Sequence, residues 1–544
     1  MANKNILLIE PSYRNKYPPL GLMKLAQYHG PNGKKDRVVF VKGEDRSAQG
    51  VPWDRIYVTT LFSFEWHRTS RAIDYALDLA RGQANRVFVG GIAASLMNER
   101  FIQEPRWRGV RFISGLLDQA PAVSLQLDQF EEELYSEDTL GTPIESLVPD
   151  YSILDNLCYR YPVHDAYFLY ASRGCIRNCE FCGVPKLEGG LRETPSISQT
   201  VHEIELRYGT KKDLIFMDNN ITASPRFNEI IAEIVDLGFA RGATITRNGQ
   251  TTKRRIDFNQ GVDARELAKN EHLMKQLART CVSPLRIAFD HLSLRKPYET
   301  SIRMAAANGL SALSNYLLYN YQDDPRDLYD RMALNVKLNE ELGIRIFSFP
   351  MRYHPVDLTD RSHVGSQWTR YQLRSIQVIL QATHGIVSGA PDFFREAFGH
   401  SCEDFENLII RPHYMIFNRK WYQEEGGQAE FVAYSNVFNK LTSAQKRELL
   451  DILSQVFFDL PNKPRLNRNE LAGYFSSEKD PLVRDILRYY IPPTREEEQA
   501  IWDRQKRTAE VNFGLAADEI VEDSGINEGF DDAGNMLDHR IYAA

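Results

Sequence analysis

Three cysteines, Cys175, Cys179 and Cys182, form the spacing Cys-x-x-x-Cys-x-x-Cys. Thiolates at this spacing on one loop can hold three irons of a 4Fe–4S cluster, whose fourth iron then lacks a protein ligand. A fourth thiolate would close a structural metal site, whereas three leave one position free for chemistry. A small chelating molecule can occupy that position and receive an electron. The spacing therefore predicts an enzyme.

A second interpretation of the three cysteines is a structural zinc site, with His164 or His202 as the fourth ligand. The spacing is unusual for zinc, and the loop follows a predicted strand, so the cluster is favoured. The remaining cysteines are isolated in the sequence, and we expect them to pack in the protein interior; they are Cys158, Cys281 and Cys402.

The cysteine loop belongs to a series of alternating strands and helices over residues 166–365. Apolar runs predict strands at 167–171, 213–217, 255–259, 285–289, 314–319 and 345–350. Helical periodicity lies between them, at 201–208, 227–237, 264–277 and 327–341. Six such units predict a partial (β/α)6 barrel related to the TIM barrel. The cysteines follow the first strand, at the carboxyl end where such barrels place their chemistry.

Residues 1–120 predict a separate α/β domain of the doubly wound, Rossmann-like type. Strands are expected at 5–10, 38–41, 55–59 and 86–89, and helices at 21–29 and 69–81. Gly90 and Gly91 directly follow the last of these strands. They either let a ligand approach the backbone or form a tight turn.

The rest of the chain is less informative. We expect a connector over 121–165, a mainly helical domain over 366–517, including a helix at 495–507, and an acidic tail over 518–544. The 544 residues include only six cysteines, carry a net charge of −7, and contain no signal-peptide pattern or membrane-length apolar run. These features predict a cytoplasmic protein without membrane contact.

Several motifs together resemble the radical S-adenosylmethionine (SAM) superfamily. The main match is Ser172-Arg173-Gly174-Cys175 through Cys179-Glu180-Phe181-Cys182, and the six strand–helix units accompany it. The order of further motifs is similar to the branch with an N-terminal cobalamin-binding-type domain. These motifs are Pro18-Pro19-Leu20-Gly21-Leu22, Val89-Gly90-Gly91, Pro149-Asp150-Tyr151, Phe216-Met217-Asp218-Asn219-Asn220 and Phe258-Asn259-Gln260-Gly261-Val262-Asp263-Ala264-Arg265.

The resemblance implies a mechanism. The three cysteines would hold the 4Fe–4S cluster, with Phe181 beside it, and SAM would chelate the open iron. An electron from an external donor such as flavodoxin or ferredoxin would cleave SAM to a 5′-deoxyadenosyl radical, which abstracts hydrogen from the substrate. The substrate is unknown. A small molecule or nucleotide is favoured, and nucleic acid stays open.

The same resemblance implies SAM-binding residues at the strand ends. Asp218 and Asn219 would meet the SAM amino group, unless Asp218 only caps a turn. The carboxylate or ribose of SAM would be reached by Asn259, Gln260, Asp263 and Arg265. Asp263 could instead cap a helix. Asp290 and His291 are candidate catalytic acid/base residues or structural hydrogen-bonding groups. Candidates for substrate or adenine contact are Tyr319, Asn320, Arg352, Tyr353 and His354.

Cobalamin binding stays open at this point. The Asp-x-His-x-x-Gly motif of many cobalamin proteins is absent, because Glu10-Pro11-Ser12-Tyr13-Arg14-Asn15 stands in its place. We expect His29 to contact the C-terminus of its own helix. With cobalamin, methylation of an unactivated carbon or of phosphorus is expected. Without it, rearrangement, oxidation or modification of a nucleotide or nucleic-acid base is at least as well supported.

Two basic segments leave further alternatives. Asn248-Gly249 predicts a hairpin within 244–258, which is either a solvated edge or a flap over an anionic substrate; its basic residues are Arg247, Lys253, Arg254 and Arg255. Another set either binds a nucleotide or lies on a packed helix; it comprises Arg361, Trp368, Arg370, Tyr371 and Arg374. A metal-stabilised nucleic-acid-binding module without catalysis is thus a rival to the enzyme.

Overall fold

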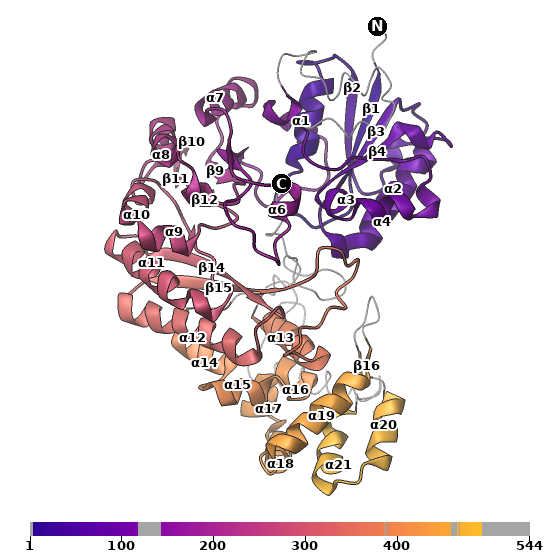
Figure 1. Ribbon diagram of the computed structural model, residues 1–544, viewed down its shortest axis with the longest axis vertical. Helices are drawn as coiled ribbons and strands as arrows, with labels where there is room; N and C mark the ends of the chain where they lie inside the picture. Colours follow the sequence, from indigo (N-terminus) through magenta and orange to yellow (C-terminus); the bar gives the residue numbers. More distant parts are fainter. Residues whose placement is uncertain are drawn as a thin grey trace.

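The structure is a computed structural model that describes residues 4–117, 143–383, 385, 387, 389–458, 465–466 and 468–491. Most of the predicted connector's first half, the helix expected at 495–507 and the acidic tail lie outside the described residues. The described residues form a mixed α/β protein with parallel sheets and many helices (Figure 1). Among them, no helix combines the length and apolar character that crossing a membrane requires.

The N-terminal region is built on a five-stranded parallel sheet with the strand order β2-β1-β3-β4-β5. The four predicted strands are present, and the short β5 is an addition. Ile6–Ile9 of β1 are fully buried, as expected for a parallel strand covered on both faces. The strands are β1 (Asn5–Glu10), β2 (Arg37–Lys42), β3 (Arg55–Thr60), β4 (Val87–Gly91) and β5 (Arg111–Phe112); the helices are α1 (Leu20–His29), α2 (Trp66–Leu79), α3 (Ile92–Leu96) and α4 (Asn98–Gln103).

The chain turns back across this sheet between β1 and β3, because β2 lies on one side of β1 and β3 on the other. In open α/β sheets, such a reversal leaves a crevice at the carboxyl ends of the strands, where ligands bind. Gly90 and Gly91 form the last two residues of β4 and lie at that end. The topology therefore indicates a ligand-binding site at this edge of the sheet.

The second region contains all six predicted strands, arranged in the order in which they occur in the sequence. Two three-stranded parallel sheets, β6-β9-β12 and β13-β14-β15, are joined where Ile256 pairs with Val282 and Val262 with Ile287. We call this arrangement the six-strand array. Its strands are β6 (Ala166–Leu169), β9 (Asp213–Phe216), β12 (Ile256–Phe258), β13 (Leu285–Arg286), β14 (Ala312–Tyr319) and β15 (Arg345–Arg352).

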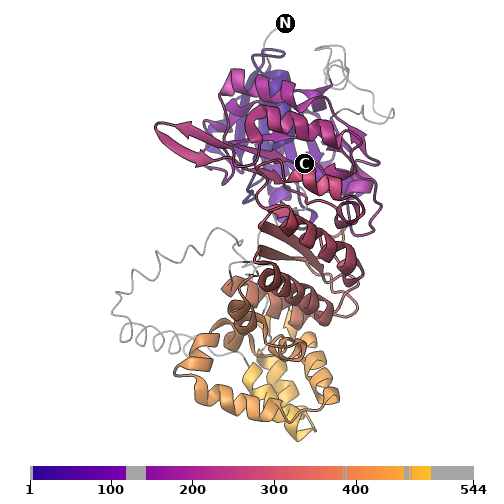
Figure 2. The same ribbon diagram turned by 90° about the vertical axis from the view of Figure 1, so that its left-hand side faces the viewer.

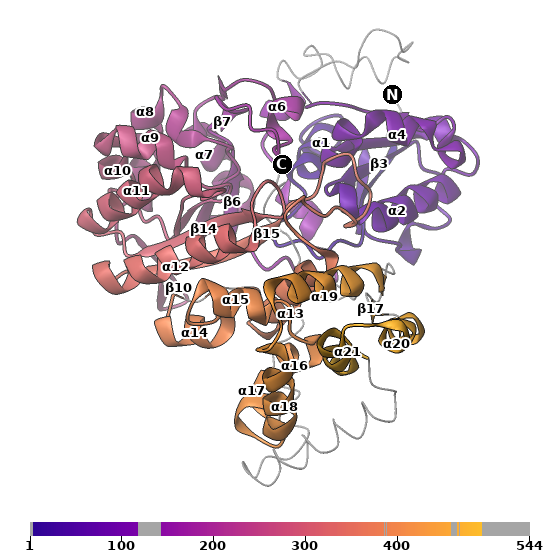
Figure 3. The same cartoon turned by 60° about the horizontal axis from the view of Figure 1, so that its bottom comes forward.

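Helices connect the strands of the array on its outer side (Figures 1 and 3). The structure splits two predicted helices and adds α11, which the sequence analysis did not identify. The helices are α7 (Ile197–Tyr208), α8 (Phe227–Ile234), α9 (Ala264–Lys269), α10 (Glu271–Leu277), α11 (Arg295–Ala307) and α12 (Pro325–Leu342).

Buried arginines tie the array together from within. Arg286 of β13 donates two hydrogen bonds, of 2.6 and 2.7 Å, to the carboxylate of Asp257 on β12. Arg331 of α12 has no exposed surface and donates to the backbone carbonyls of Phe289 and Asp290, at 3.0 and 3.1 Å. Such a buried guanidinium requires these partners, since an unpaired buried charge is strongly destabilising. Arg331 thereby fixes the segment that follows β13.

The predicted hairpin is present as β10 (Thr244–Arg247) and β11 (Gln250–Lys253), with Asn248 and Gly249 at positive φ. In Figure 2 it projects from the body as a pair of magenta arrows. It precedes β12 and so emerges at the amino ends of the strands, whereas the cysteine loop follows β6 at the carboxyl ends. The interpretation as a flap over the substrate is therefore wrong.

Two of the four basic residues of the hairpin segment have side-chain partners within the protein. Arg247 donates to Asp165 at 2.6 Å, and the Arg254 guanidinium lies 3.6 Å above the Phe239 ring and donates to the Lys212 carbonyl. The remaining two are Lys253, which is exposed, and Arg255, whose backbone N–H donates to Asp213.

The C-terminal described residues are mainly helical. The helices are α13 (Arg370–Ala382), α14 (Pro391–Phe398), α15 (Cys402–Leu408), α16 (His413–Phe417), α17 (Arg419–Glu424), α18 (Gln428–Phe438), α19 (Ser443–Gln455), α20 (Arg468–Ser477) and α21 (Pro481–Leu487), with the strand pair β16 (Phe457–Phe458) and β17 (Arg465–Leu466). A capping box between Thr369 and Gln372 begins α13.

The aromatic residues around the start of α13 are packed rather than displayed. Tyr371 has no exposed surface and stacks on His413, with ring centroids 4.3 Å apart. Trp368 is buried against Tyr319, and its indole N–H donates to Asp323. Arg374 donates to Gln377 on the same helix, three residues along. The nucleotide-binding interpretation of this face is therefore wrong, because its aromatic groups are not accessible.

Candidate active site

The cysteines lie on the loop between β7 (Ser172–Arg173) and α6 (Val184–Leu187). Gly174 begins the loop at a φ of 76°, and a Cβ atom there would come within 2.3 Å of the Gly190 carbonyl oxygen, so only glycine fits. All three thiols are half-buried. The Cys175 sulfur accepts hydrogen bonds from the Arg177 backbone N–H at 3.3 Å and from Asn220 Nδ2 at 3.6 Å.

The cysteines line a cavity of about 210 Å³, which we call the cluster pocket. Its wall continues over the carboxyl ends of β9, β12, β13, β14 and β15, as expected for an α/β array of this order. The lining residues used below are Arg177, Phe181, Asn219, Asn220, Gln260, Asp263, Arg265, Asp290, Arg352, Tyr353 and His354, with Ser63 and Phe64 from the N-terminal region.

Burial raises the pKa of the Cys179 thiol and raises that of Cys182 to about 12. The Arg265 guanidinium opposes the shift at Cys179. In the metal-free protein these groups therefore hold their protons at neutral pH. Binding of iron by these cysteines would release those protons, because only the thiolate binds iron.

Most of the predicted SAM-binding residues meet in the cluster pocket. The pocket is lined by Asn219, Gln260, Asp263 and Arg265, together with Phe181. The candidate catalytic residue Asp290 lines it as well. The Phe181 ring also meets Tyr321 edge to face, with centroids 5.7 Å apart.

Asp263 has two functions in this geometry. It caps α9 by accepting the Arg265 backbone N–H at 2.9 Å, as the structural interpretation predicted, and it also pairs with the side chains of Arg265 and Arg177 at 2.8 and 2.9 Å. Burial opposes its ionisation, but these hydrogen bonds outweigh burial and hold the pKa of Asp263 below its usual range. The ionised cap thus keeps two arginines at the pocket wall.

Three predicted site residues do not line the cluster pocket. Asp218 is buried and turned toward Ala171 and Ser172, whose backbone N–H groups donate to its carboxylate. Asn259 is fully buried and accepts the Tyr17 hydroxyl at 2.8 Å. His291 is exposed and bonded to Ser293. Each is held by a partner outside the pocket, which contradicts the predicted placement.

Two further substrate candidates also fall outside the pocket lining. Tyr319 is buried against Trp368. Asn320 is buried, donates to the Tyr353 and His363 carbonyls at 3.2 Å and accepts the Gly365 backbone N–H at 2.8 Å. Both residues therefore fix the loop that follows β15, while Arg352, Tyr353 and His354 reach the pocket.

Asp218 gives the cysteine loop a testable pH dependence. Burial raises its pKa to about 7, so the folded chain keeps a proton that the unfolded chain loses near pH 4. The stability from this proton is complete below about pH 4 and is lost as the pH rises through 7. Between pH 5 and 7 the wild type should therefore lose about 2 kcal/mol more of its unfolding free energy than Asp218→Asn does.

Guanidinium unfolding of the cluster-free protein at each pH measures this difference. Asp236→Asn, at an exposed position on the segment after α8, is the control and should follow the wild type. Parallel pH curves for Asp218→Asn and the wild type would contradict the prediction.

The sequence analysis missed several residues that complete the site. Glu188 accepts the Gly174 backbone N–H at 2.7 Å and Asn219 Nδ2 at 3.0 Å, so it joins the cysteine loop to the end of β9. Asn220 could have been predicted from the sequence, because it directly follows Asn219 in the same motif. Phe64 had no sequence signal, because it lies more than 100 residues before the cysteines.

The proposed zinc ligands are bonded elsewhere. His164 meets Arg160 and the Tyr161 carbonyl, and His202 meets the Ser198 carbonyl. Neither histidine lines the cluster pocket. Within the part of the chain that the structure describes, no three His, Cys, Asp or Glu side chains converge as a single metal ion requires. This zinc arrangement is therefore contradicted.

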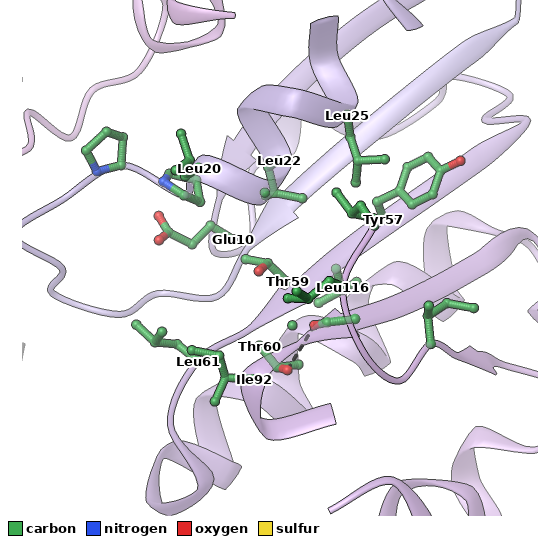
Figure 4. Close-up of a pocket in the computed structure, with 18 of the residues that line it drawn as sticks. Glu10, Leu20, Leu22, Leu25, Tyr57, Thr59, Thr60, Leu61, Ile92 and Leu116 are labelled. Atoms are coloured by element: carbon green, nitrogen blue, oxygen red, sulfur yellow. Dashed lines mark hydrogen bonds between the residues drawn. The ribbon is translucent and has the colours of Figure 1, made fainter. Parts of the chain in front are cut away.

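A second cavity, the N-terminal pocket, lies at the carboxyl ends of the N-terminal sheet. Figure 4 shows Glu10, Tyr57, Thr59, Thr60 and Ile92 around it. Gly90 and Gly91 line it as well, and the Thr60 hydroxyl donates to the Gly90 carbonyl at 2.9 Å. A Cβ atom at Gly91 would lie 2.4 Å from the Thr60 carbonyl oxygen, so this edge requires glycine.

Arg173 reaches the N-terminal pocket from the array. Its Nε and Nη1 atoms are buried and have no hydrogen-bond partner among the described residues, and its Nη2 lies 3.7 Å from Glu145 and 3.5 Å from Glu188. Buried donors without acceptors are costly, so a ligand with oxygen acceptors suits this wall.

No histidine lines the N-terminal pocket among the described residues. His29 is the last residue of α1, as expected, and its side chain is fully buried, with Nδ1 2.9 Å from Asp36 and Nε2 3.2 Å from the Tyr57 hydroxyl. The pairing with Asp36 replaces the predicted cap contact. The surrounding residues therefore offer the pocket no imidazole ligand for a metal.

The two pockets share a dividing wall. Leu61 and Phe62 line the N-terminal pocket, and the next two residues, Ser63 and Phe64, line the cluster pocket. The rings of Phe62 and Phe64 stack with centroids 5.1 Å apart. Helix α6 contributes to both pockets in the same way, with Leu187 on one side and Val184 on the other.

The chain was compared with known proteins. No family model and no curated protein matches the sequence. Its structural neighbours include the radical S-adenosylmethionine methyltransferase TsrM from Kitasatospora setae, with tryptophan substrate and a SAM analogue bound. That comparison gives 12% identity and a TM-score of 0.43, and it covers 75% of this chain and 89% of TsrM.

A second neighbour is the cobalamin-dependent S-adenosylmethionine radical enzyme OxsB, with aqua-cobalamin and S-adenosylmethionine bound. It also has 12% identity and a TM-score of 0.43, and the match covers 97% of this chain and 82% of OxsB. At these TM-scores, the case for function rests on the chain's own residues.

Proposed function

We propose that this protein is a radical SAM enzyme of the cobalamin-dependent type and that it transfers a methyl group. In this proposal the six-strand array is the partial (β/α)6 radical SAM barrel, and residues 1–120 form the cobalamin-binding-type domain. The observation that carries it is the cluster pocket, in which three cysteines of one loop face polar groups from successive strand ends. Four thiolates would have suggested a structural site.

The cysteines and the polar residues at the first strand ends of the cluster pocket have proposed roles. Cys175, Cys179 and Cys182 hold the 4Fe–4S cluster, which with SAM supplies a 5′-deoxyadenosyl radical. Asn219 and Asn220 replace Asp218 as the groups that meet the SAM amino group, since they line the pocket. Gln260 and Arg265 bind the SAM carboxylate or ribose, and Asp263 orients Arg265.

Asp290 lines the same wall, and burial raises its pKa to about 6. Arg331 holds its backbone carbonyl and thus its position. A carboxyl group at this place can orient SAM or exchange a proton with the substrate. His291 has no part in the proposal because its ring is exposed.

The N-terminal pocket is the proposed cobalamin site. Gly90 lets a large ligand approach the backbone, because only Ile113 lies near its Cβ position. The buried Nε and Nη1 groups of Arg173, which have no hydrogen-bond partner among the described residues, can donate to acceptors on that ligand. Because no histidine among the described residues lines the pocket, these residues supply no imidazole to cobalt. The dividing wall of Phe62 and Phe64 brings the two sites next to each other, as methyl transfer between them requires.

The proposal includes a small-molecule substrate and an external reductant such as flavodoxin or ferredoxin, in a cytoplasmic setting. Modification of a nucleotide without cobalamin is the second candidate. A nucleic-acid-binding module is less well supported, because the basic hairpin emerges opposite the cluster pocket and the side chains of Arg247 and Arg254 have partners within the protein.

Anaerobic reconstitution tests the proposal. Protein loaded with iron and sulfide, then given dithionite and SAM, should form 5′-deoxyadenosine, and hydroxocobalamin should co-elute with it. Protein that binds one equivalent of zinc and assembles no cluster would contradict the proposed radical SAM activity. Cluster assembly without cobalamin retention would favour the second candidate.

A further inference from the structure

His354 lines the cluster pocket, and its two ring nitrogens are the subject of this inference. It follows β15, and neither Nδ1 nor Nε2 is exposed or hydrogen-bonded among the described residues. A neutral imidazole carries one N–H donor and one acceptor. Leaving such groups buried without partners costs free energy. The ring therefore has hydrogen-bonding capacity available for a molecule that enters the pocket.

The surroundings of His354 are apolar and cationic. Its ring lies 5.4 Å from that of Phe64, and the Arg361 guanidinium covers Phe64 at 4.1 Å. Leu318 and Met351 line the same pocket. Burial, together with Arg361 and Arg352, holds the pKa of His354 well below its usual range. The imidazole is thus neutral at physiological pH and can both donate and accept.

The position of His354 separates it from the proposed SAM-binding groups. Those groups follow β9, β12 and β13, which neighbour the cysteine-bearing end of the array. His354 follows β15, the last strand in the order, and lies beside the Phe64 wall that divides the two pockets. A substrate that receives a group from one site and is activated at the other must lie along this wall.

We propose that His354 binds the substrate and that the substrate has a flat apolar body carrying a hydroxyl or N–H group. This inference rests on the proposed function. Phe64, Leu318 and Met351 cover the apolar body, and His354 hydrogen-bonds to the polar group. An imidazole in this setting selects against an analogue that lacks this group, because its own nitrogen would then stay unpaired.

Phenol and toluene test the inference, since they have the same ring and differ in carrying a hydroxyl or a methyl group of similar size. Binding of each is measured by ligand-observed NMR on cluster-loaded enzyme with SAM present. The wild type should bind phenol about fivefold more tightly than toluene. His354→Phe keeps a ring but removes both nitrogens, and should lose this preference. His363→Phe changes a neighbouring histidine that does not line the pocket, and should keep it.

The outcomes separate this inference from the proposed function. The role of His354 is overturned if the wild type binds phenol and toluene equally or binds neither. It is also overturned if His354→Phe keeps the wild-type preference for phenol. If His354→Phe binds SAM more weakly but still prefers phenol, His354 contacts the adenine of SAM, and its proposed role in substrate binding is overturned. 5′-Deoxyadenosine formation is measured on the same preparations. Its absence from the wild type would contradict the proposed function alone.

Discussion

Replacement of Cys179 by alanine is expected to abolish both the cluster and the formation of 5′-deoxyadenosine. Two thiolates cannot hold the three irons that the loop is built to ligate, and no other cysteine lines the cluster pocket among the described residues. Iron and sulfide content, visible absorption and product analysis after dithionite and SAM measure the effect. Product should fall to background.

Cys158→Ala is the matched control for this variant. Cys158 is exposed, which contradicts the expectation that it packs in the interior, and it lies outside the cluster pocket. The control should therefore assemble the cluster and cleave SAM as the wild type does. Cys179→Ala should also retain cobalamin, because its cysteine does not line the N-terminal pocket. A normal iron content in Cys179→Ala would refute the proposed ligand set.

The second large effect concerns cobalamin. A Cβ atom at Gly90 would meet only Ile113, at 3.8 and 3.9 Å, and Ile113 also lines the N-terminal pocket. Gly90→Leu should therefore fill the cavity with little strain on the strand. Overpacking typically costs about 1–3 kcal/mol, which corresponds to a loss of roughly 5- to 150-fold in affinity for hydroxocobalamin. Spectroscopic titration measures this affinity.

Gly473→Leu is the control for the added side chain, since Gly473 of α20 has open space around its Cβ position. It should bind cobalamin like the wild type. Gly90→Leu should still assemble the cluster, because Gly90 does not line the cluster pocket. Unchanged cobalamin affinity in Gly90→Leu would remove the N-terminal pocket from the proposal.

Much of the fold could be predicted from the sequence. Strands such as Ile6–Ile9 are continuous apolar runs because both faces of a parallel sheet are covered, and this pattern is local. The six strands of the array were predicted for the same reason. Helix α11 was missed because its buried positions are few and are spaced among charged residues.

The site was less predictable, because it depends on the direction of single side chains. Asp218 and Asn219 are adjacent at the end of β9, yet one turns to the Ser172 backbone and the other to the cluster pocket. Motif position alone cannot separate such neighbours. Phe64 was out of reach for another reason, since the packing of two distant regions brings it to the site.

The hairpin of β10 and β11 has a practical consequence. Its exposed tip at Asn248 and Gly249 lies at the amino ends of the strands, away from the cysteines. A loop in this position can be lengthened or replaced in evolution without changing the chemistry. It is equally a suitable point at which to insert a peptide tag or a fluorophore, so that the enzyme can be immobilised or followed with both pockets left open.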